Sequence, residues 1–538
     1  MPGPRFAAVP CQGENGHIAS RSTRRLRKKI LLGVAALIAT AAVAPRADAA
    51  PGMIVGFDEA AFLRDSSRSV PVAQRLGATA IRVSLGWNLY QTQLTAPDAT
   101  ALRTLTGVAS AGGMRIVLSV AASSPNQAPL DALGRSSYCG YLANIVKRFT
   151  TIKDVVVWNE PNLSLFWRPQ FNPDGTPAAP KAYEALLAEC YDDLHAVQPQ
   201  VNVIAPATCP RGTDIAWEST SISVSPGEFI IDMGEAYRAS GRTRPLFDTI
   251  GHHVYGTTPA ERPWRVHSDS TAIAEGDLNT LLDAFQQGFA GTPQPLPGQG
   301  VSIWYLEAGY QTTVPASKAA FYYGVENIAQ VLPPVGGPPD PPNPSATSPA
   351  PDQATQIRDG LQLAYCQPYV GAFFNFMLFD DPNLAGYQSA PFWTDRTPKP
   401  SYAAFRDSIA AVKGGTIDCS PSASAAAAAA AAQAPSSRRA RAVVLTFSVP
   451  RRVRARAWVQ VRLRFNVAVR NEPVQLQHRM RRRYAFLAAA IVSGRKATVR
   501  IRLARGRHEL RIAYKSGLLL RHTAPAVVVA SPRLRRRT

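Results

Sequence analysis

The sequence predicts an α/β protein: a (β/α)8 TIM barrel followed by a small all-β domain, an immunoglobulin-like sandwich. Three observations support this fold class. Short apolar segments rich in β-branched and aromatic residues recur eight times between residues 53 and 380. Segments with helical periodicity separate most of them, and a strict alternation of apolar and charged residues replaces both patterns beyond residue 438.

The eight apolar segments are the expected barrel strands. They are residues 53–57, 80–85, 115–120, 155–158, 201–206, 247–254, 301–306 and 370–376. Helical periodicity is present at residues 138–149, 181–197, 356–365 and 401–412. Strands that alternate with helices pair in parallel, and eight such units fit a closed barrel. A doubly wound open sheet is the alternative, but the chain lacks the glycine-rich phosphate turn expected there.

Composition divides the chain into four regions. We expect a signal peptide at residues 1–49, the barrel domain at 50–419, an Ala/Ser-rich linker at 420–437 and an arginine-rich sandwich at 438–538. A proline-dense insertion at 333–351 follows the seventh strand and would lie at the C-terminal end of the barrel. This insertion is either a lid or a loop without a function of its own.

The N-terminus has the pattern of an export signal. Basic residues at 24–29 precede an apolar run at 30–44, and Ala47-Asp48-Ala49 then offers the small residues that a signal peptidase requires. The apolar run is shorter than the roughly 20 residues that span a bilayer. We therefore expect a secreted or cell-surface protein, with an uncleaved anchor as the alternative.

Five cysteines follow the predicted signal peptide, and none has the spacing of a metal ligand set. Exported proteins form disulfides. We expect Cys366, on a late helix, to pair with Cys419 at the end of the barrel domain. The odd number leaves at least one thiol unpaired, or paired outside the chain.

Positive charge is concentrated in the last region. Residues 436–538 contain 27 Lys and Arg against 2 Asp and Glu, whereas the rest of the chain has 32 against 35. A basic face binds polyanions. Export and the lack of a recognition motif argue against nucleic acid, so an anionic cell-wall or membrane surface is the expected partner. A solvated sandwich without a partner is the alternative.

The strongest local motif is Trp158-Asn159-Glu160-Pro161-Asn162, which follows the apolar segment 155–157. In a barrel, catalytic groups stand at the C-terminal ends of the strands. Apolar neighbours such as Trp158 and Phe166 would keep Glu160 protonated, as a general acid requires. Asn159 could hold a sugar hydroxyl. The alternative is that Glu160 only caps a helix.

A second carboxylate ends the seventh strand, in Leu306-Glu307-Ala308-Gly309-Tyr310. Alone, Glu307 could equally be a structural, salt-bridged residue. Three units away from Glu160 in a barrel, it could face that residue across the mouth. Two carboxyl groups about 5–5.5 Å apart form the arrangement of a retaining glycosidase. The pair therefore predicts Glu160 as acid/base and Glu307 as nucleophile.

Other polar residues stand at neighbouring strand ends. Tyr255 could donate to Glu307, and His253 to the substrate. His252 and His253 are adjacent on a strand and point to opposite faces, so a shared metal is not expected. Arg82 lies within the second strand and needs an anionic partner, either Glu307 or a structural carboxylate elsewhere.

These motifs resemble clan A glycoside hydrolases, in particular families 39 and 5, over residues 51–415. The Asn159-Glu160 pair is similar to their acid/base signature, and the segment around Glu307 to their nucleophile signature. The resemblance implies active-site roles for Arg82, His253 and Tyr255, and substrate binding by Trp393. In many members a tryptophan ends the eighth strand, but here residues 375–380 contain none, and position 306 is leucine rather than a small polar residue.

The predicted function is that of a secreted retaining glycosidase that hydrolyses O-glycosyl compounds, with a carbohydrate substrate and neither a metal nor an organic cofactor. A non-catalytic carbohydrate-binding or surface protein on the same scaffold is the alternative. Several tryptophans offer stacking surfaces without selecting a sugar, namely Trp87, Trp158, Trp167, Trp264, Trp304 and Trp393.

Overall fold

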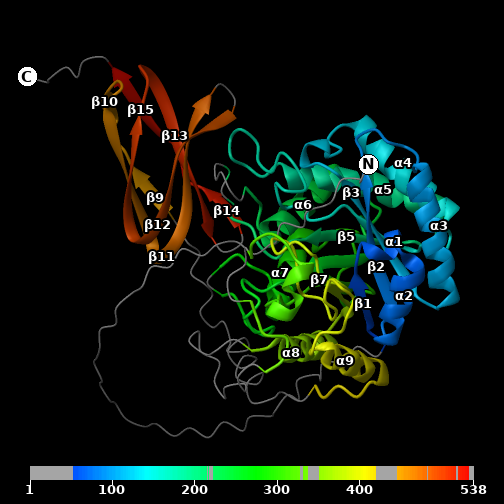
Figure 1. Ribbon diagram of the computed structural model, residues 1–538. Helices are drawn as coiled ribbons and strands as arrows, with labels where there is room; N and C mark the ends of the chain where they lie inside the picture. The colour runs from blue at the N-terminus through cyan, green and yellow to red at the C-terminus, as the bar shows by residue number, and fades with distance from the viewer. Residues whose placement is uncertain are drawn as a thin grey trace, which may run out of the picture.

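The computed structural model describes residues 52–214, 216, 222–268, 270–326, 331–336, 351–419, 445–480, 483–516 and 519–531. The predicted signal peptide, the predicted linker and most of the proline-dense insertion lie outside the described residues. The described chain forms a barrel of strands surrounded by helices and an all-β domain beside it (Figure 1).

Eight parallel strands close the barrel in sequence order, each paired with its neighbours along the chain and β8 with β1. The strands are β1 (Ile54–Asp58), β2 (Ala80–Trp87), β3 (Arg115–Ala122), β4 (Asp154–Val157), β5 (Asn202–Thr208), β6 (Thr249–His253), β7 (Ser302–Ala308) and β8 (Val370–Phe376). All eight coincide with the predicted segments to within a few residues. The predicted (β/α)8 TIM barrel is confirmed.

Helices cover the outside of the barrel (Figure 1). They are α1 (Ala61–Arg64), α2 (Ser66–Arg75), α3 (Ala96–Ala111), α4 (Ala132–Arg148), α5 (Ala179–Val197), α6 (Pro226–Ser240), α7 (Leu278–Phe289), α8 (Gln353–Cys366) and α9 (Tyr402–Gly414). Side-chain caps fix several helix starts: Asp131 accepts a hydrogen bond from the Gly134 amide and Asp352 from that of Thr355. None of the described helices is long and apolar enough to cross a membrane.

Side chains of alternate strand residues fill the barrel, as the period of two requires. Ala80, Val117 and Val156 belong to this inner cluster, together with Phe374 of β8. Gly56 on β1 makes room for that ring, because a Cβ there would lie 2.6 Å from the Phe374 Cε1 atom. Arg82 is two residues beyond Ala80 and so shares its inward face. The packed floor therefore lies beneath a buried guanidinium.

Disulfides join Cys139 to Cys190 and Cys366 to Cys419. The second is the predicted pairing and ties α8 to the end of the barrel domain. Cys209 is also disulfide-bonded, and no cysteine among the described residues is a free thiol. The sequence left one thiol either unpaired or paired outside the chain, and the first of these alternatives is wrong for the described part of the chain.

The C-terminal domain is all-β, as predicted. Its strands are β9 (Leu445–Ser448), β10 (Arg452–Arg454), β11 (Trp458–Met480), β12 (Arg483–Arg502), β13 (Gly506–Ser516), β14 (Leu519–His522) and β15 (Ala526–Ser531). The long β11 pairs with β12 along its length and with β9 and β13 at different ends, so the strands form one connected sheet. Alternate residues such as Val461, Leu463 and Ile512 form its own core.

Candidate active site

The loop after β4 presents Glu160 in an unusual backbone conformation. Trp158 and Glu160 have φ angles of 71° and 41°, in the left-handed region that residues with side chains seldom adopt. Two hydrogen bonds hold the loop there: the Trp158 amide donates to the Tyr138 hydroxyl (3.0 Å) and the Glu160 amide to the Ala207 carbonyl (3.1 Å). Backbone strain that surrounding contacts enforce is typical of functional sites.

Two further anchors fix this loop. The Trp158 ring packs edge-on or tilted against Trp87, Tyr138 and Trp167, and all four rings are buried. The Asn162 side-chain amide donates to three backbone carbonyls in the segments that follow β5 and precede α6. Asn162 was not predicted to have a role. Because its contacts join three segments distant in sequence, no local signal could have revealed them.

Glu307, near the end of β7, is held by two donors. The Arg82 Nη1 atom lies 2.7 Å from Oε1, and the Tyr255 hydroxyl donates to Oε2 at 3.0 Å. The Glu307 side chain keeps 12% of its surface exposed, whereas Arg82 has none. The carboxylate is thus fixed by a cation and a hydroxyl, with one side open toward the mouth.

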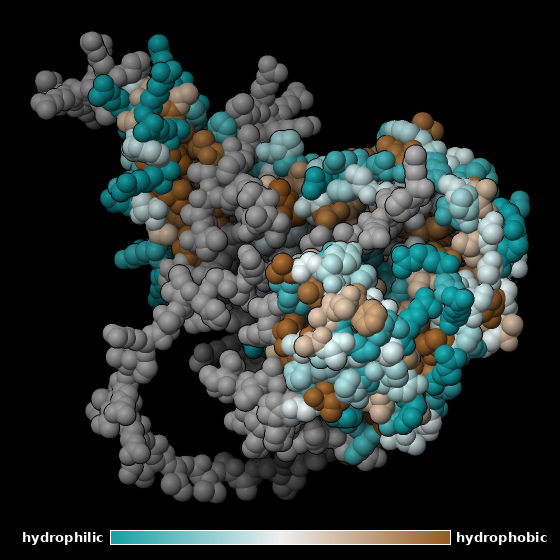
Figure 2. Space-filling model, in the orientation of Figure 1, coloured by the Kyte–Doolittle hydropathy of each residue, from teal (hydrophilic) through white to brown (hydrophobic). Residues whose placement is uncertain are grey.

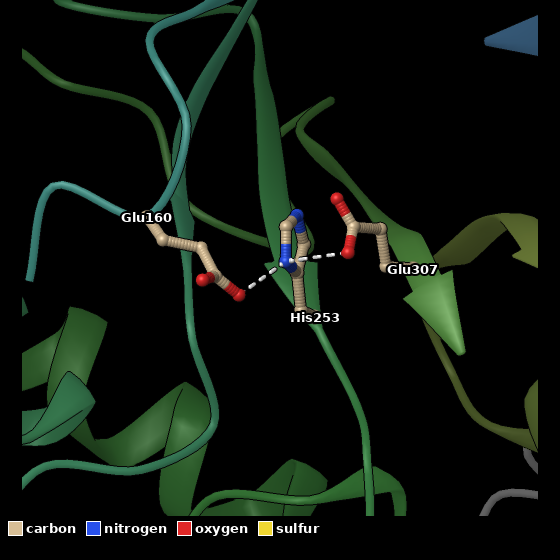
Figure 3. A group of neighbouring side chains, drawn as sticks. All are labelled: Glu160, His253 and Glu307. Carbon is tan, nitrogen blue, oxygen red and sulfur yellow. Dashed lines mark hydrogen bonds and ion pairs between the residues drawn. The ribbon is translucent and has the colours of Figure 1, made fainter. Parts of the chain in front are cut away.

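His253 lies between the two glutamates (Figure 3). Its Nδ1 atom is 2.8 Å from Glu160 Oε1 and 3.5 Å from Glu307 Oε2. One oxygen of each carboxylate and this nitrogen all lie within 4.8 Å of one another. The predicted facing of Glu160 and Glu307 across the barrel mouth is therefore present, with an imidazole joining them.

The surroundings drive the two carboxyl groups toward different protonation states. Burial raises the pKa of Glu160, and the hydrogen bond and charge of His253 only partly oppose this shift. Burial also opposes ionisation of Glu307, but His253, Arg82 and Tyr255 outweigh it and lower its pKa. Two nearby carboxyl groups whose pKa values are driven apart are arranged for one acid and one base or nucleophile.

Arg82 connects more of the site than the sequence predicted. It pairs with Asp58, which is the β1 residue in register with it, as well as with Glu307. Its Nη2 atom also donates to the Asn159 Oδ1 atom at 3.0 Å. Burial raises the pKa of Asp58 to about 7 despite the opposing charge of Arg82. Both partners that the sequence left open for Arg82, Glu307 and a structural carboxylate, are present.

The set formed by Glu160, His253 and Glu307 could in principle hold a metal ion. Its contacts favour proton chemistry instead. The His253 Nδ1 atom is engaged with Glu160, and Glu307 already carries the Arg82 cation at 2.7 Å. A divalent ion would have to displace these contacts and lie beside a buried positive charge.

The structure brings four of the five predicted ligands, Arg82, Asn159, His253 and Tyr255, into one network with both glutamates. His252 points away from it: its ring contacts Thr208 and the Ile273 carbonyl. Trp393 is 4% exposed and packs over the Lys399 ammonium at 4.7 Å, and no contact with either glutamate is among the described interactions. Its substrate-binding role stays a prediction.

The tryptophans predicted as stacking surfaces are mostly in the core. Those buried at 4% exposure or less are Trp87, Trp158, Trp167, Trp304 and Trp393. Trp87, Trp158 and Trp167 are fully covered and cannot present a face to a sugar, so the prediction is wrong for these three. The aromatic spacing alone could not separate core packing from a binding platform.

No protein-family model and no curated protein matches the chain. Solved structures with a similar fold include a family 39 glycoside hydrolase from Bacteroides cellulosilyticus WH2 (14% identity, 83% of this chain and 80% of that one, TM-score 0.45). Others are a glucosidase from Croceicoccus marinus (11%, 85% and 94%, 0.44) and a modular endo-β-1,4-mannanase from Cellulomonas fimi (13%, 89% and 94%, 0.36). At such low identity, the chemistry has to be argued from this chain's own side chains.

Replacing Tyr255 with Phe should shift the acidic limb of the pH–rate profile to higher pH. The hydroxyl stabilises ionised Glu307, so its loss raises the pKa of that group. Activity that requires ionised Glu307 is then lost at a higher pH as the solution is acidified. The measurement is kcat/KM against pH with an aryl glycoside.

Tyr310→Phe is the matched control for this prediction. The Tyr310 hydroxyl lies 3.4 Å from Glu275 and contacts neither glutamate of the pair. Its profile should overlay that of the unchanged protein. An acidic limb that does not move in Tyr255→Phe would show that the hydroxyl does not tune Glu307.

Proposed function

We propose that this chain is a retaining O-glycoside hydrolase that acts by double displacement. The observation that carries the proposal is the pair of glutamates at the ends of β4 and β7. Their nearest oxygens lie within 4.8 Å, and their pKa values are shifted in opposite directions. The barrel and the resemblance to clan A enzymes agree with this chemistry.

In the first step Glu307 attacks the anomeric carbon and Glu160 gives its proton to the departing oxygen. The bond from the sugar to the leaving group breaks as the bond to the Glu307 oxygen forms. In the second step Glu160 takes a proton from water, whose oxygen displaces Glu307 from the same carbon. Arg82 and Tyr255 stabilise the carboxylate before attack and as it leaves.

The separation of the carboxyl groups supports retention over inversion. Inverting enzymes keep their two carboxyl groups about 6.5–9.5 Å apart so that a water fits between them and the sugar. Here the nearest oxygens of the two groups lie within 4.8 Å of each other, and the His253 Nδ1 atom contacts both carboxylates, which leaves little room for a water between them and a sugar. Direct attack by Glu307 is therefore the favoured geometry.

The proposal is tested by the stereochemistry of the product. A panel of aryl glycosides of both anomers and several sugars is offered to the full chain, and the configuration of the first product is followed by proton NMR. The initial product should have the configuration of the substrate. Inversion would refute the assigned roles, and no turnover of any aryl or polymeric glycoside would favour the non-catalytic carbohydrate-binding alternative.

We further propose that the protein is exported and that its C-terminal domain holds it on an anionic cell-surface polymer. One face of the β11–β12 pair supports this proposal. Its exposed cations are Arg462, Arg464, Lys496, Arg500 and Arg502, which alternate with core residues along both strands. The Trp458 ring, 61% exposed, lies under the Arg502 guanidinium at 4.3 Å. Hydrophilic side chains line the outer edge of this domain in Figure 2.

Substituting Gln for Arg462, Arg464 and Arg500 in the full chain should weaken binding to polygalacturonate without reducing turnover of a small aryl glycoside. Cations that bind a polyanion release its counterions, so the logarithm of the affinity falls with the logarithm of salt concentration. The variant should show a lower affinity and a shallower salt slope. Sedimentation with insoluble polymer at several salt concentrations measures both.

The matched control replaces Arg68, Arg75 and Arg103, three exposed arginines of the barrel, with Gln. It removes the same charge and should keep the salt slope. A chain that ends at Cys419 lacks the C-terminal domain, so it should keep turnover of the aryl glycoside but lose binding to the polymer. Equal loss of binding in both triple variants would mean that net charge, and not this face, is responsible.

A further inference from the structure

The segment that follows β5 is a rigid turn beside Glu160. Two backbone contacts hold it: the Ile273 amide donates to the Pro210 carbonyl at 2.8 Å, and the Asn162 side chain to the Arg211 carbonyl at 3.2 Å. A Cβ on Gly212 would lie 2.3 Å from the Val224 carbonyl oxygen, so the backbone is packed from that side as well. The position of Arg211 is therefore fixed by the same asparagine that anchors the Glu160 loop.

The Arg211 side chain has no anionic partner among the described residues. Its Nη2 atom is buried and makes no hydrogen bond, and none of the described ion pairs includes it. Burial lowers the pKa of Arg211, and the opposing effects of Tyr387, Glu160 and Glu261 are smaller. Arg211 is half-buried, so the cost falls on the Nη2 group: a buried donor without a hydrogen bond is unfavourable, and native proteins retain few of them.

The unpaired guanidinium acts on the catalytic centre. Burial raises the pKa of Glu160, and the Arg211 charge is a minor effect that opposes this rise; Arg211 is also within electrostatic reach of Tyr387. The Tyr387 ring lies 5.6 Å from that of Tyr255, the donor to Glu307. Arg211 follows the C-terminal end of β5, the neighbour of β4 in the barrel, and its carbonyl accepts a hydrogen bond from Asn162 of the Glu160 loop, so it lies at the mouth of the barrel on the side of Glu160. By contrast, Arg82 already has anionic partners: Nη1 pairs with Asp58 and Glu307, and Nη2 donates to Asn159, which leaves only Nε without a hydrogen bond.

We propose that Arg211 binds an anionic substituent of the substrate, and that the natural substrate is an acidic glycan. A carboxylate or a sulfate ester would accept the planar pair of N–H donors that a guanidinium offers. A neutral sugar would leave the half-buried guanidinium without an anionic partner. This inference rests on the proposed glycosidase function, which makes the ligand a glycan, and it adds that the glycan is acidic.

The test compares matched probes with the full chain. The substrates are methylumbelliferyl uronides and the corresponding neutral glycosides of both anomers, together with an acidic polysaccharide and its carboxyl-reduced form. A sulfated polysaccharide distinguishes sulfate from carboxylate recognition. Arg211→Gln should lower the ratio of kcat/KM for acidic over neutral substrate by about 10- to 100-fold, the range for a lost hydrogen bond to a charged group. The loss should appear mainly in KM.

Arg211→Lys retains the charge without the planar fork and should recover only part of the preference. Arg168→Gln, at an exposed arginine after β4, is the control and should keep the ratio. Binding of free D-glucuronate, of inorganic sulfate and of D-glucose, measured calorimetrically, provides a readout apart from turnover. Arg211→Gln should remove the difference between either anion and glucose.

The outcomes separate this inference from the proposed function. If the unchanged protein cleaves neutral glycosides as well as acidic ones, and the ratio is the same in Arg211→Gln, the anion site is wrong while the glycosidase stands. If nothing is cleaved but the anions bind in an Arg211-dependent way, the anion site stands and the glycosidase is wrong. If neither cleavage nor anion binding occurs, both are wrong.

Discussion

Glu307→Ala should reduce hydrolysis of every glycoside substrate by on the order of 10⁵-fold or more, the scale seen when a covalent nucleophile is removed from other hydrolases. The loss should not depend on the leaving group, because no glycosyl-enzyme can form without the attacking oxygen. Azide should restore turnover by occupying the vacated space and attacking the anomeric carbon. With only one displacement, the glycosyl azide should have the opposite configuration to the substrate.

The measurement is the rate with and without azide, and the configuration of the azide product by NMR. Glu235→Ala, at an exposed glutamate on α6, is the control and should be fully active. A glycosyl azide with the configuration of the substrate would contradict the role of Glu307.

Structural damage has to be separated from loss of the nucleophile. Removing Glu307 leaves Arg82 with Asp58 as its remaining carboxylate partner. Glu307→Gln keeps the shape and can still accept a hydrogen bond, so it should be as inactive as the alanine variant while unfolding at a similar temperature. Activity in Glu307→Gln near that of the unchanged protein would show that this carboxylate is not the nucleophile.

Sequence alone predicted the barrel because its strands are buried on both faces. Such strands appear in the sequence as continuous apolar runs, for example residues 155–157 and 370–376, and helical segments separate most of them. The carboxylate pair was predictable for a related reason: polar residues directly after buried strands must meet at one end of a parallel barrel. His253 and Tyr255 followed from the same rule.

What the sequence could not show depends on contacts between distant segments. The sequence places Asp58 at the end of an apolar segment, as it places Glu160 shortly after one. Only the register of β1 against β2 reveals that Asp58 pairs with Arg82. The unpaired state of Arg211 is likewise invisible, since any arginine in a sequence has many carboxylates to choose from. The sequence could not show whether Trp87 and Trp158 pack in the core or stack on a sugar, because an indole ring is suited to either environment.

Glu160→Ala should fail in a way that depends on the leaving group. Without a proton donor, substrates with poor leaving groups should react about 10²–10⁴-fold more slowly, the usual contribution of general acid–base catalysis. Dinitrophenyl glycosides need little protonation, so attack by Glu307 should proceed almost as before. The substitution removes the Glu160 carboxylate from His253, its neighbour at 2.8 Å. Arg82 and Tyr255 still contact Glu307 and keep the Glu307 carboxyl group ionised.

The second step should then become the slow one, since no base remains to activate water. Glycosyl-enzyme should accumulate with dinitrophenyl substrates and appear as a mass adduct on the peptide that contains Glu307. Azide needs no base and should release the sugar with the configuration of the substrate, because two displacements occur. Because azide speeds the release of the sugar, the mass adduct on Glu307 should disappear when azide is present.

The pH dependence gives a further distinction between the two glutamates. Burial raises the pKa of Glu160, and the proposed mechanism requires its protonated form in the first step, so Glu160 should set the basic limb of the kcat/KM profile. That limb should disappear in Glu160→Ala with dinitrophenyl substrates, while the acidic limb set by Glu307 should remain. If instead the basic limb persists, or if azide gives the same product configuration in Glu160→Ala as in Glu307→Ala, the two carboxyl groups do not have the separate roles that their surroundings assign to them.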